Sequence, residues 1–167
     1  MKDIPSYRLN FMNEVHPDEL TYTYRPFAAY KDKKLKNPFS GCAVLYDDYG
    51  RLSFKRYYIE GLPEGPEIEY WKNGNLMSKR NFKKGKLHGL WEEYWENGKL
   101  RFRKNFKKDK LDGLWEKYNL NGNLILKFTY KDDVLDGPYE RYSPKTGRIK
   151  EKGTYYGGTK VVDNVFE

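Results

Sequence analysis

The chain is poor in the residues from which compact reactive sites are built. Its 167 residues include one cysteine, Cys42, and two histidines, His16 and His88. One thiol cannot form an internal disulfide, and so few soft ligands cannot supply a cysteine-based or multi-histidine metal centre. No cofactor is therefore expected.

Long apolar stretches are also missing. The longest apolar runs span a few residues, which excludes a membrane-spanning helix. The start, MKDIPSYRLNFMNEV, has no apolar signal core, so secretion by a standard signal peptide is not expected. A cytoplasmic location follows as an expectation.

Aliphatic residues are scarce and aromatic residues are abundant. Leu, Ile, Val and Phe make up 36 residues, about 22% of the chain, close to the roughly 20% below which disorder is expected. In contrast, 4 Trp, 16 Tyr and 9 Phe bring much apolar area in few positions. We therefore expect one folded domain with a thin core. A net charge of +8 and a pI near 9.3 favour an anionic partner.

The dominant feature is an internal repeat. Glycines recur every 24 residues at Gly41, Gly65, Gly89, Gly113 and Gly137. Five units start from them, the fifth with one extra residue in its turn. A fixed period of this length is typical of a solenoid or array.

Each unit is predicted to form a β-hairpin. In unit three, Asn97-Gly98 separates two aromatic-rich segments, and this dipeptide favours a two-residue type I′ turn. That turn would pair Glu96 with Lys99, Tyr94 with Arg101, and Glu92 with Arg103. The five hairpins predict an all-β fold, an elongated antiparallel meander of about ten strands over residues 41–160.

The same register assigns two faces to the sheet. In unit three a core face is predicted for Trp91, Trp95, Leu100, Phe102 and Phe106. A solvent face is predicted for Glu92, Tyr94, Arg101, Arg103 and Asn105. Two core columns recur along the array: Leu52, Leu76, Leu100, Leu124 and Ile149, and Tyr58, Phe82, Phe106, Tyr130 and Tyr155.

Both ends of the chain depart from the period. Residues 1–40 are interpreted as a divergent N-terminal repeat or cap, because an open array needs its first edge covered. Residues 161–167 are interpreted as a last strand or a frayed tail.

The unit G-x-W-x-x-Y-x-x-N-G-x-L, followed by an aromatic residue and then G-K-L-x-G, resembles the bacterial variant of the MORN repeat. The residues that carry the resemblance are Gly89, Trp91, Tyr94, Asn97, Gly98, Leu100, Phe106, Lys110, Leu111 and Gly113. Unit one departs from the pattern at Ala43 and Tyr49. The resemblance implies a non-catalytic binding scaffold, with antitoxin or immunity proteins of bacterial toxin systems as the more specific form.

No catalytic set is evident. His88 lies in a turn where later units carry Asp112 and Asp136, and Cys42 occupies a position filled by Pro or Leu elsewhere. The glycines punctuate hairpins and do not precede helices, and GxxxxGK[ST] is absent. The chain is therefore not expected to be an enzyme.

One constellation on the predicted solvent face suggests a binding strip. A basic column lies beside a tyrosine column: Lys55, Lys79, Arg103, Lys127 and Lys152 beside Tyr46, Tyr70, Tyr94, Tyr118 and Tyr142. Tyr and Arg are enriched in protein interfaces. The alternative is a solvated face without a binding function, in which Glu92 pairs with Arg103 and Glu116 pairs with Lys127. In units one and two the residues opposite Lys55 and Lys79 are Val44 and Ile68, which carry no charge. We therefore expect surplus positive charge in units one to three.

Two functions remain open at this stage. The first is a scaffold that binds another protein, such as a toxin with an acidic surface, and blocks it by occlusion. The second is binding of nucleic acid or anionic lipid head groups through the basic and Tyr-rich face.

Overall fold

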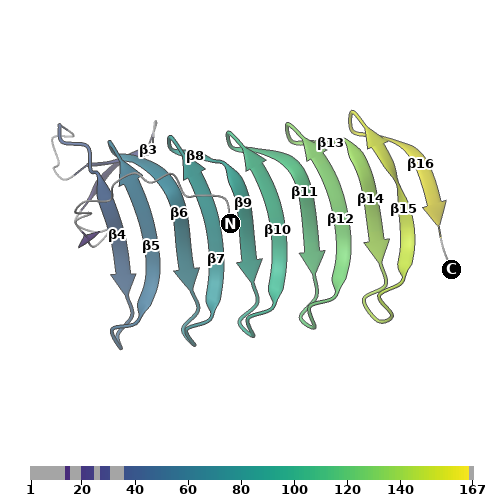
Figure 1. The fold of residues 1–167 in the computed structure, drawn as a ribbon, viewed down its shortest axis with the longest axis horizontal. Helices are drawn as coiled ribbons and strands as arrows, with labels where there is room; N and C mark the ends of the chain where they lie inside the picture. Colours follow the sequence, from purple (N-terminus) through teal and green to yellow (C-terminus); the bar gives the residue numbers. More distant parts are fainter. Residues whose placement is uncertain (1–13, 16–19, 25–26, 31–35, 166–167) are drawn as a thin grey trace, which may run out of the picture.

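The computed structural model describes residues 14–15, 20–24, 27–30 and 36–165. These residues form strands and turns and no helix, and most of the strands join one 14-stranded sheet. Figure 1 shows the hairpins side by side along the long axis of the molecule. The predicted all-β array of repeated hairpins is confirmed.

The sheet follows chain order from the N-terminal to the C-terminal end. Its strands are β1 (Glu14–Val15), β4 (Gly41–Tyr46), β5 (Leu52–Ile59), β6 (Leu62–Tyr70), β7 (Leu76–Lys83), β8 (Lys86–Leu87), β9 (Gly89–Tyr94), β10 (Leu100–Lys107), β11 (Lys110–Tyr118), β12 (Leu124–Lys131), β13 (Val134–Leu135), β14 (Gly137–Tyr142), β15 (Ile149–Tyr156) and β16 (Thr159–Val165). β1 pairs with β4 in parallel, and the other pairs are antiparallel. A separate hairpin joins β2 (Thr21–Tyr24) to β3 (Phe27–Tyr30).

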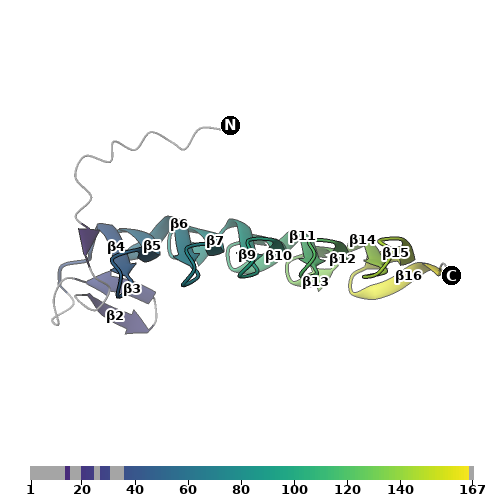
Figure 2. The ribbon, with the colours of Figure 1, turned by 90° about the horizontal axis from the view of Figure 1, so that it is seen from below.

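Most of the sheet is a single layer. Figure 2 shows the described strands from below in one row, with β2 and β3 beside the first strands. β3 contacts β6. The large sheet therefore has two long faces, and packing of a second layer on it is confined to its N-terminal end.

The turn within each hairpin differs from the prediction. In unit three the N–H of Gly98 donates to the carbonyl of Trp95, and the N–H of Trp95 donates to the carbonyl of Lys99, both at 2.8 Å. Gly98 has a positive φ of 82°, whereas Asn97 does not. This is a type I turn followed by a glycine bulge, a three-residue loop, and the predicted type I′ turn is wrong. The Asn97 side chain favours it, because its Oδ1 accepts the N–H of Lys99 at 3.0 Å.

This turn changes the pairing near the tip and leaves the distant pairing intact. Tyr94 lies opposite Leu100, so the predicted pairs Tyr94–Arg101 and Glu96–Lys99 are wrong. Arg101 is the extra residue of a bulge. Beyond the bulge Glu92 lies opposite Arg103, as predicted. The extra residue of the loop and the extra residue of the bulge compensate each other, so the register beyond the bulge is the predicted one.

The bulge also moves the aliphatic column to the other face. Each of its members lies directly opposite a tyrosine of its own hairpin: Leu52 opposite Tyr46, Leu76 opposite Tyr70, Leu100 opposite Tyr94, Leu124 opposite Tyr118 and Ile149 opposite Tyr142. Its assignment to the core face is wrong, because one extra residue in a strand inverts the side on which the following side chains lie.

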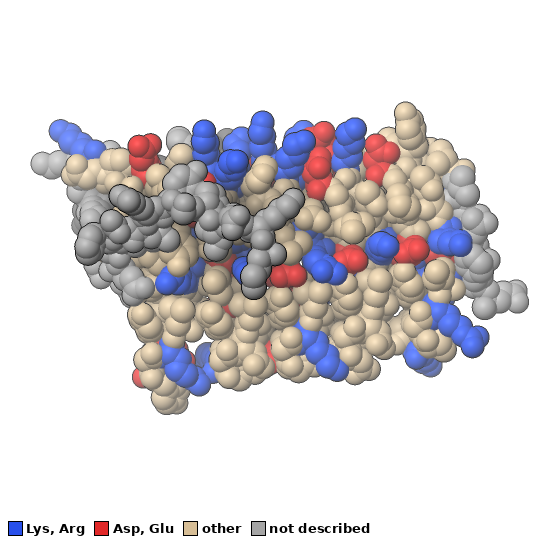
Figure 3. All heavy atoms as spheres, viewed as in Figure 1, with Lys and Arg blue, Asp and Glu red and all other residues tan. Residues whose placement is uncertain are grey.

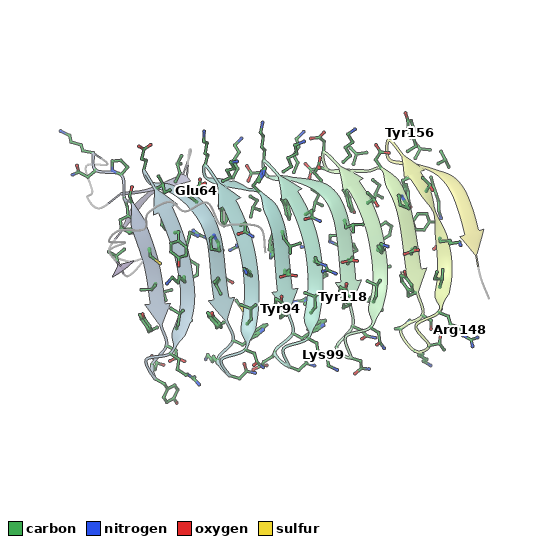
Figure 4. All side chains as sticks on the ribbon, in the orientation of Figure 1. Glu64, Tyr94, Lys99, Tyr118, Arg148 and Tyr156 are labelled. Carbon is green, nitrogen blue, oxygen red and sulfur yellow. The ribbon has the colours of Figure 1, made fainter. Side chains whose placement is uncertain are left out.

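Two-residue turns with positive φ at both central residues occur between the units. Examples are Lys84-Gly85 and Lys108-Asp109, which connect paired residues such as Lys83 and Lys86. We call these the upper turns and the turns within hairpins the lower tips. In Figure 4, Glu64 and Tyr156 lie near the upper turns, and Lys99 and Arg148 near the lower tips. The two kinds of turn alternate along the sheet.

The glycines that start units four and five pack closely against a preceding strand. A Cβ on Gly137 would lie 3.0 Å from the Cβ of Thr129, and one on Gly113 would lie 3.1 Å from that of Asn105. Both glycines have positive φ, 120° and 115°. Gly65 and Gly89 have open space around them but share the positive φ, 82° and 90°. The backbone conformation therefore accounts for the glycine period, and close packing adds to it in units four and five.

The core is confined and lies mainly at the first repeat. Leu20, Phe39, Ala43 and Tyr58 form a buried cluster, with Val15 packed against it. In unit three, by contrast, Trp91, Trp95, Phe102 and Phe106 are only half-buried. Phe128 and Tyr139, in units four and five, are buried as well. The predicted core face is therefore an aromatic face that is buried toward both ends of the array and half-exposed between them.

Candidate functional site

The predicted binding strip lies on one face of the sheet, which we call the ladder face. In the central row of this face, each basic residue of the strip lies between one residue of the preceding strand and one residue of the following strand. Arg103 lies opposite Glu92 within its hairpin and opposite Glu116 of the next, and Lys127 lies between Glu116 and Glu140. Figure 3 shows the resulting alternation of blue and red across the middle of the molecule. The row is a ladder of alternating charge that continues from one hairpin to the next.

Several tyrosines and bases of the strip form hydrogen bonds within the ladder face. Nε of Arg103 lies 2.8 Å from Oε2 of Glu116, and its Nη2 donates to the hydroxyl of Tyr118 at 3.2 Å. The hydroxyl of Tyr94 donates to Glu92 at 3.0 Å. Tyr94 and Tyr118 lie on neighbouring hairpins above the tips in Figure 4. In units three and four, side chains of the strip are therefore already engaged in contacts within the sheet.

The electrostatics of the tyrosines follow from these hydrogen bonds. Burial and the hydrogen bond to Glu92 raise the pKa of Tyr94 to about 12. Burial and the bond to Glu140, 2.6 Å long, raise the pKa of Tyr142 to about 12. The donated hydroxyl and the charge of Lys127 in turn lower the pKa of Glu140. These hydroxyls therefore remain protonated donors at neutral pH.

The first two units lack part of this compensation. Lys55 lies between Val44 and Ile68, and Lys79 lies between Ile68 and Glu92. Lys79 is exposed and forms no ion pair with the described residues. Because Arg103 has an acid on both sides, the expected surplus of positive charge does not extend along this row to unit three.

The opposite face, which we call the ring face, carries the aromatic side chains that were predicted to form the core. Ring contacts run along it, from Trp91–Phe106 at 5.6 Å through Phe102–Trp115 at 6.1 Å to Phe128 and Tyr139 at 5.7 Å. Together these contacts form a nearly continuous aromatic surface.

Cations alternate with the rings. The Arg80 guanidinium lies 5.2 Å from the ring of Trp91, and Nζ of Lys104 lies 4.6 Å from the same ring. Glu67 is 1% exposed and is bound by both Arg56 and Arg80. The sequence contains a sign of this face, because Arg56, Arg80 and Lys104 occupy one repeat position on the side of the sheet that was predicted to be core.

The ring face also contains a hollow of about 230 Å³ near β6, β7 and β9. Its apolar walls include Trp71, Met77 and Trp91, and its polar residues include Glu69 and Glu93. Burial raises the pKa of Glu69, against the opposing charge of Arg80. The repeat pattern does not indicate this hollow, because its residues come from four different strands.

The described residues contain no assembled catalytic or metal site. No group of three or more His, Cys, Asp or Glu among them is placed to hold a metal ion. Cys42 is buried, and His88 lies half-buried at an upper turn, where its backbone N–H donates to the carbonyl of Asn81. The same part of the chain contains no helix long and apolar enough to cross a membrane.

The repeat type is borne out by comparison with known families. Residues 63–84, 87–108 and 111–132 match the MORN repeat variant. The chain thus contains three tandem matches, which begin at the upper turns and coincide with units two to four. A search of curated proteins found no match.

Among solved structures, the chain resembles one in the crystal structure of accessory secretory protein 1,2 and 3 in Streptococcus pneumoniae. The TM-score is 0.35 and the identity 17%, over 63% of this chain and 19% of that one. This chain therefore spans about a fifth of the length of that protein.

Proposed function

We propose that the protein is a non-catalytic scaffold that binds another protein through its ring face. One observation carries the proposal: the ring face is left open in the middle of the array, whereas its aromatic residues are buried toward the C-terminal end, at Phe128 and Tyr139, and at the first repeat. Leu20 and Phe39 pack against Ala43 and Tyr58 at that end. In unit three the corresponding aromatic residues are half-exposed.

The composition of the open part supports protein binding. Trp, Tyr and Arg are the residues that contribute most to protein interfaces when they are enclosed by a partner. Trp91, Trp95 and Arg101 lie together here, with the Arg101 guanidinium 4.6 Å from the ring of Trp95. A partner that covers these rings would remove apolar area from water, which stabilises a complex.

The strip of ten residues on the ladder face remains a predicted second surface. Its alternating glutamates disfavour a run of phosphates from Glu92 onward, since every second position of the central row is acidic there. Binding of nucleic acid or anionic lipid head groups through this strip is the competing function, and these glutamates argue against it. A steep linear fall of log K with log salt would indicate it.

The test compares two matched double variants. Lys104→Glu with Lys117→Glu alters the ring face, where both ammonium groups lie over the ring of Phe102. Lys55→Glu with Lys79→Glu makes the same change of charge on the ladder face. A partner is captured from an extract of the source cells, identified, purified and titrated against each folded variant.

We expect the ring-face variant to weaken binding at least about tenfold and the ladder-face variant to change it less than about threefold. The reverse result would assign the interface to the ladder face. A nucleic acid or lipid as the captured partner would overturn the proposal. The more specific proposal of an antitoxin or immunity protein requires that the partner be a toxin whose activity the purified chain inhibits by occlusion.

A further inference from the structure

A single residue of the ring face interrupts a row that otherwise carries large side chains. The second strands of units one to four place Phe54, Ser78, Phe102 and Leu126 at equivalent positions. Ser78 is the small member of this set, and it lines the hollow of about 230 Å³. Where unit three fills the position with a ring, unit two leaves space.

Two carboxylates flank this space. Glu69 lies opposite Ser78 in the β6–β7 pair, and Glu93 lies opposite Ser78 in the β7–β9 pair. Glu69 shares Arg80 with Glu67, at 3.2 Å for the pair Arg80–Glu69. Glu93 forms no ion pair within the described part of the chain. One half-buried carboxylate of the hollow is thus left without a cation.

Elsewhere the sheet places opposite charges in alternation. Arg103 lies between Glu92 and Glu116 on the ladder face, and Glu67 is bound by Arg56 and Arg80 on the ring face. In the row through Ser78 two acids flank a neutral residue, so the position of the cation is empty. Charge complementarity at this point favours a positively charged occupant.

The walls of the hollow define the shape of that occupant. Trp71 and Met77 offer apolar surfaces for a side-chain stem and for a flat group, whereas the ring of Trp91 already faces Arg80 and Lys104. A guanidinium is planar, stacks on aromatic faces and pairs with carboxylates in a fork geometry, whereas an ammonium does not stack. The chain uses the same arrangement internally, since Arg56 lies 5.3 Å from the ring of Phe54 and is bound by Glu67.

Arg101 also lines the hollow and does not fill this role. Its guanidinium is stacked on two rings, 4.6 Å from Trp95 and 4.9 Å from Phe102. It forms no ion pair with Glu93. The space between Glu69 and Glu93 therefore stays available.

We propose that the hollow over Ser78 binds an arginine side chain of the partner protein. The inference rests on the proposed function and names the chemistry of one anchor in that interface. The surface is continuous with the part of the ring face that Leu20 and Phe39 already cover. The arginine would lie against Trp71 and pair with Glu93.

The test uses a small probe and needs no identified partner. N-acetyl-argininamide is titrated into the full chain at constant ionic strength, and the indole N–H signals of Trp71 and Trp91 are followed by NMR. The matched probes are the citrulline analogue, which is planar and neutral, and N-acetyl-lysinamide, which is charged and not planar. We expect saturable shifts with the arginine probe and at least about threefold weaker binding of both others.

Two variants and one control locate the site. Glu93→Gln keeps the shape of the hollow and removes the charge, so it should weaken the arginine probe about three- to tenfold. Ser78→Phe introduces the residue of units one and three and should abolish binding. Glu140→Gln, on the ladder face, should leave the affinity unchanged. Equal binding of the arginine and citrulline probes, or binding insensitive to Glu93→Gln, would overturn the inference.

The outcome is separable from that of the proposed function. A chain that captures its partner through the ring face but does not bind the arginine probe would refute the arginine site and leave the scaffold function intact. A chain that binds the probe while its partner docks on the ladder face would refute the ring-face interface. If Ser78→Phe does not fold, Glu93→Gln decides the result.

Discussion

Leu87 and Asp109 bind each other reciprocally across two successive upper turns. The N–H of Leu87 donates to Oδ1 of Asp109 at 2.8 Å, and the N–H of Asp109 donates to the carbonyl of Leu87 at 2.9 Å. Leu111 and Asp133 repeat the arrangement one unit later. Each upper turn thereby fixes the position of the next, independently of any packed core.

Asp109→Ala should lower the free energy of unfolding by about 1–2 kcal/mol. The substitution leaves the N–H of Leu87 without its acceptor and places an alanine at a φ of 72°. Asp109→Asn keeps an acceptor oxygen and tolerates this conformation, so it should cost less than about 0.5 kcal/mol. Urea unfolding measures both. Equal losses would show that the side-chain bond does not link the turns.

Substitution of one aromatic column should have different effects along the array. Tyr58 and Phe106 occupy the same repeat position, but Tyr58 is 1% exposed and Phe106 is half-buried. Tyr58→Ala should cost about 3–5 kcal/mol, and Phe106→Ala about 1.5–3 kcal/mol, because less apolar area leaves water at the second site. Thermal unfolding of both variants is the measurement. A larger loss for Phe106→Ala would place the core in the middle of the array.

Glu67 is the acid whose loss should be most costly. Glu67→Ala leaves Arg56 and Arg80 without their shared carboxylate in a poorly solvated position, at about 2–4 kcal/mol. Lys110→Ala, which removes an exposed ion pair with Asp132, should cost less than about 1 kcal/mol. Chemical unfolding in low and high salt distinguishes them, since added salt should shrink only the second effect.

The lowered pKa of Glu140 predicts an acid-dependent loss of stability. The hydroxyl of Tyr142 and the charge of Lys127 favour the ionised carboxyl in the folded chain, whose pKa therefore lies below the unfolded value of 4.5. The stabilisation is present above pH 4.5 and is lost as the pH falls through the folded pKa. The stability difference between the wild-type chain and Glu140→Gln should shrink over that range. A constant difference would contradict the assignment.

Glu69 provides a contrast of opposite sign. Burial raises its pKa above 4.5, so the folded chain binds the proton more tightly than the unfolded chain does. Relative to Glu69→Gln, the wild-type chain should gain stability as the pH falls through the raised pKa toward 4.5. Urea unfolding at several pH values measures both glutamates, and shifts of the same sign would refute one of the two environments.

The candidate sites were predictable to different degrees. The ladder row could be aligned from the period alone, because Glu92 and Arg103 keep their register beyond the bulge. The continuation from Arg103 to Glu116 could not be established in the same way, since it depends on how one hairpin pairs with the next. The repeat pattern did not predict the hollow either, because the hollow also depends on how neighbouring hairpins pair. Only the pairing of three strands shows that Ser78 lies between two carboxylates.

The sequence by itself determined the hairpin array, because glycine and Asn-Gly at a fixed spacing restrict where the backbone can turn and strands between those turns have one simple way to pair. The tertiary structure decided which side of the sheet the side chains near the tips occupy. A type I turn with a bulge at Arg101 placed Leu100 beside Tyr94, and a local signal does not distinguish this turn from a type I′ turn when both accept Asn-Gly. The tertiary structure also decided what is buried. In a single-layer sheet burial depends on what lies over a face, and the cover formed by Leu20 and Phe39 at the first repeat comes from residues outside the period.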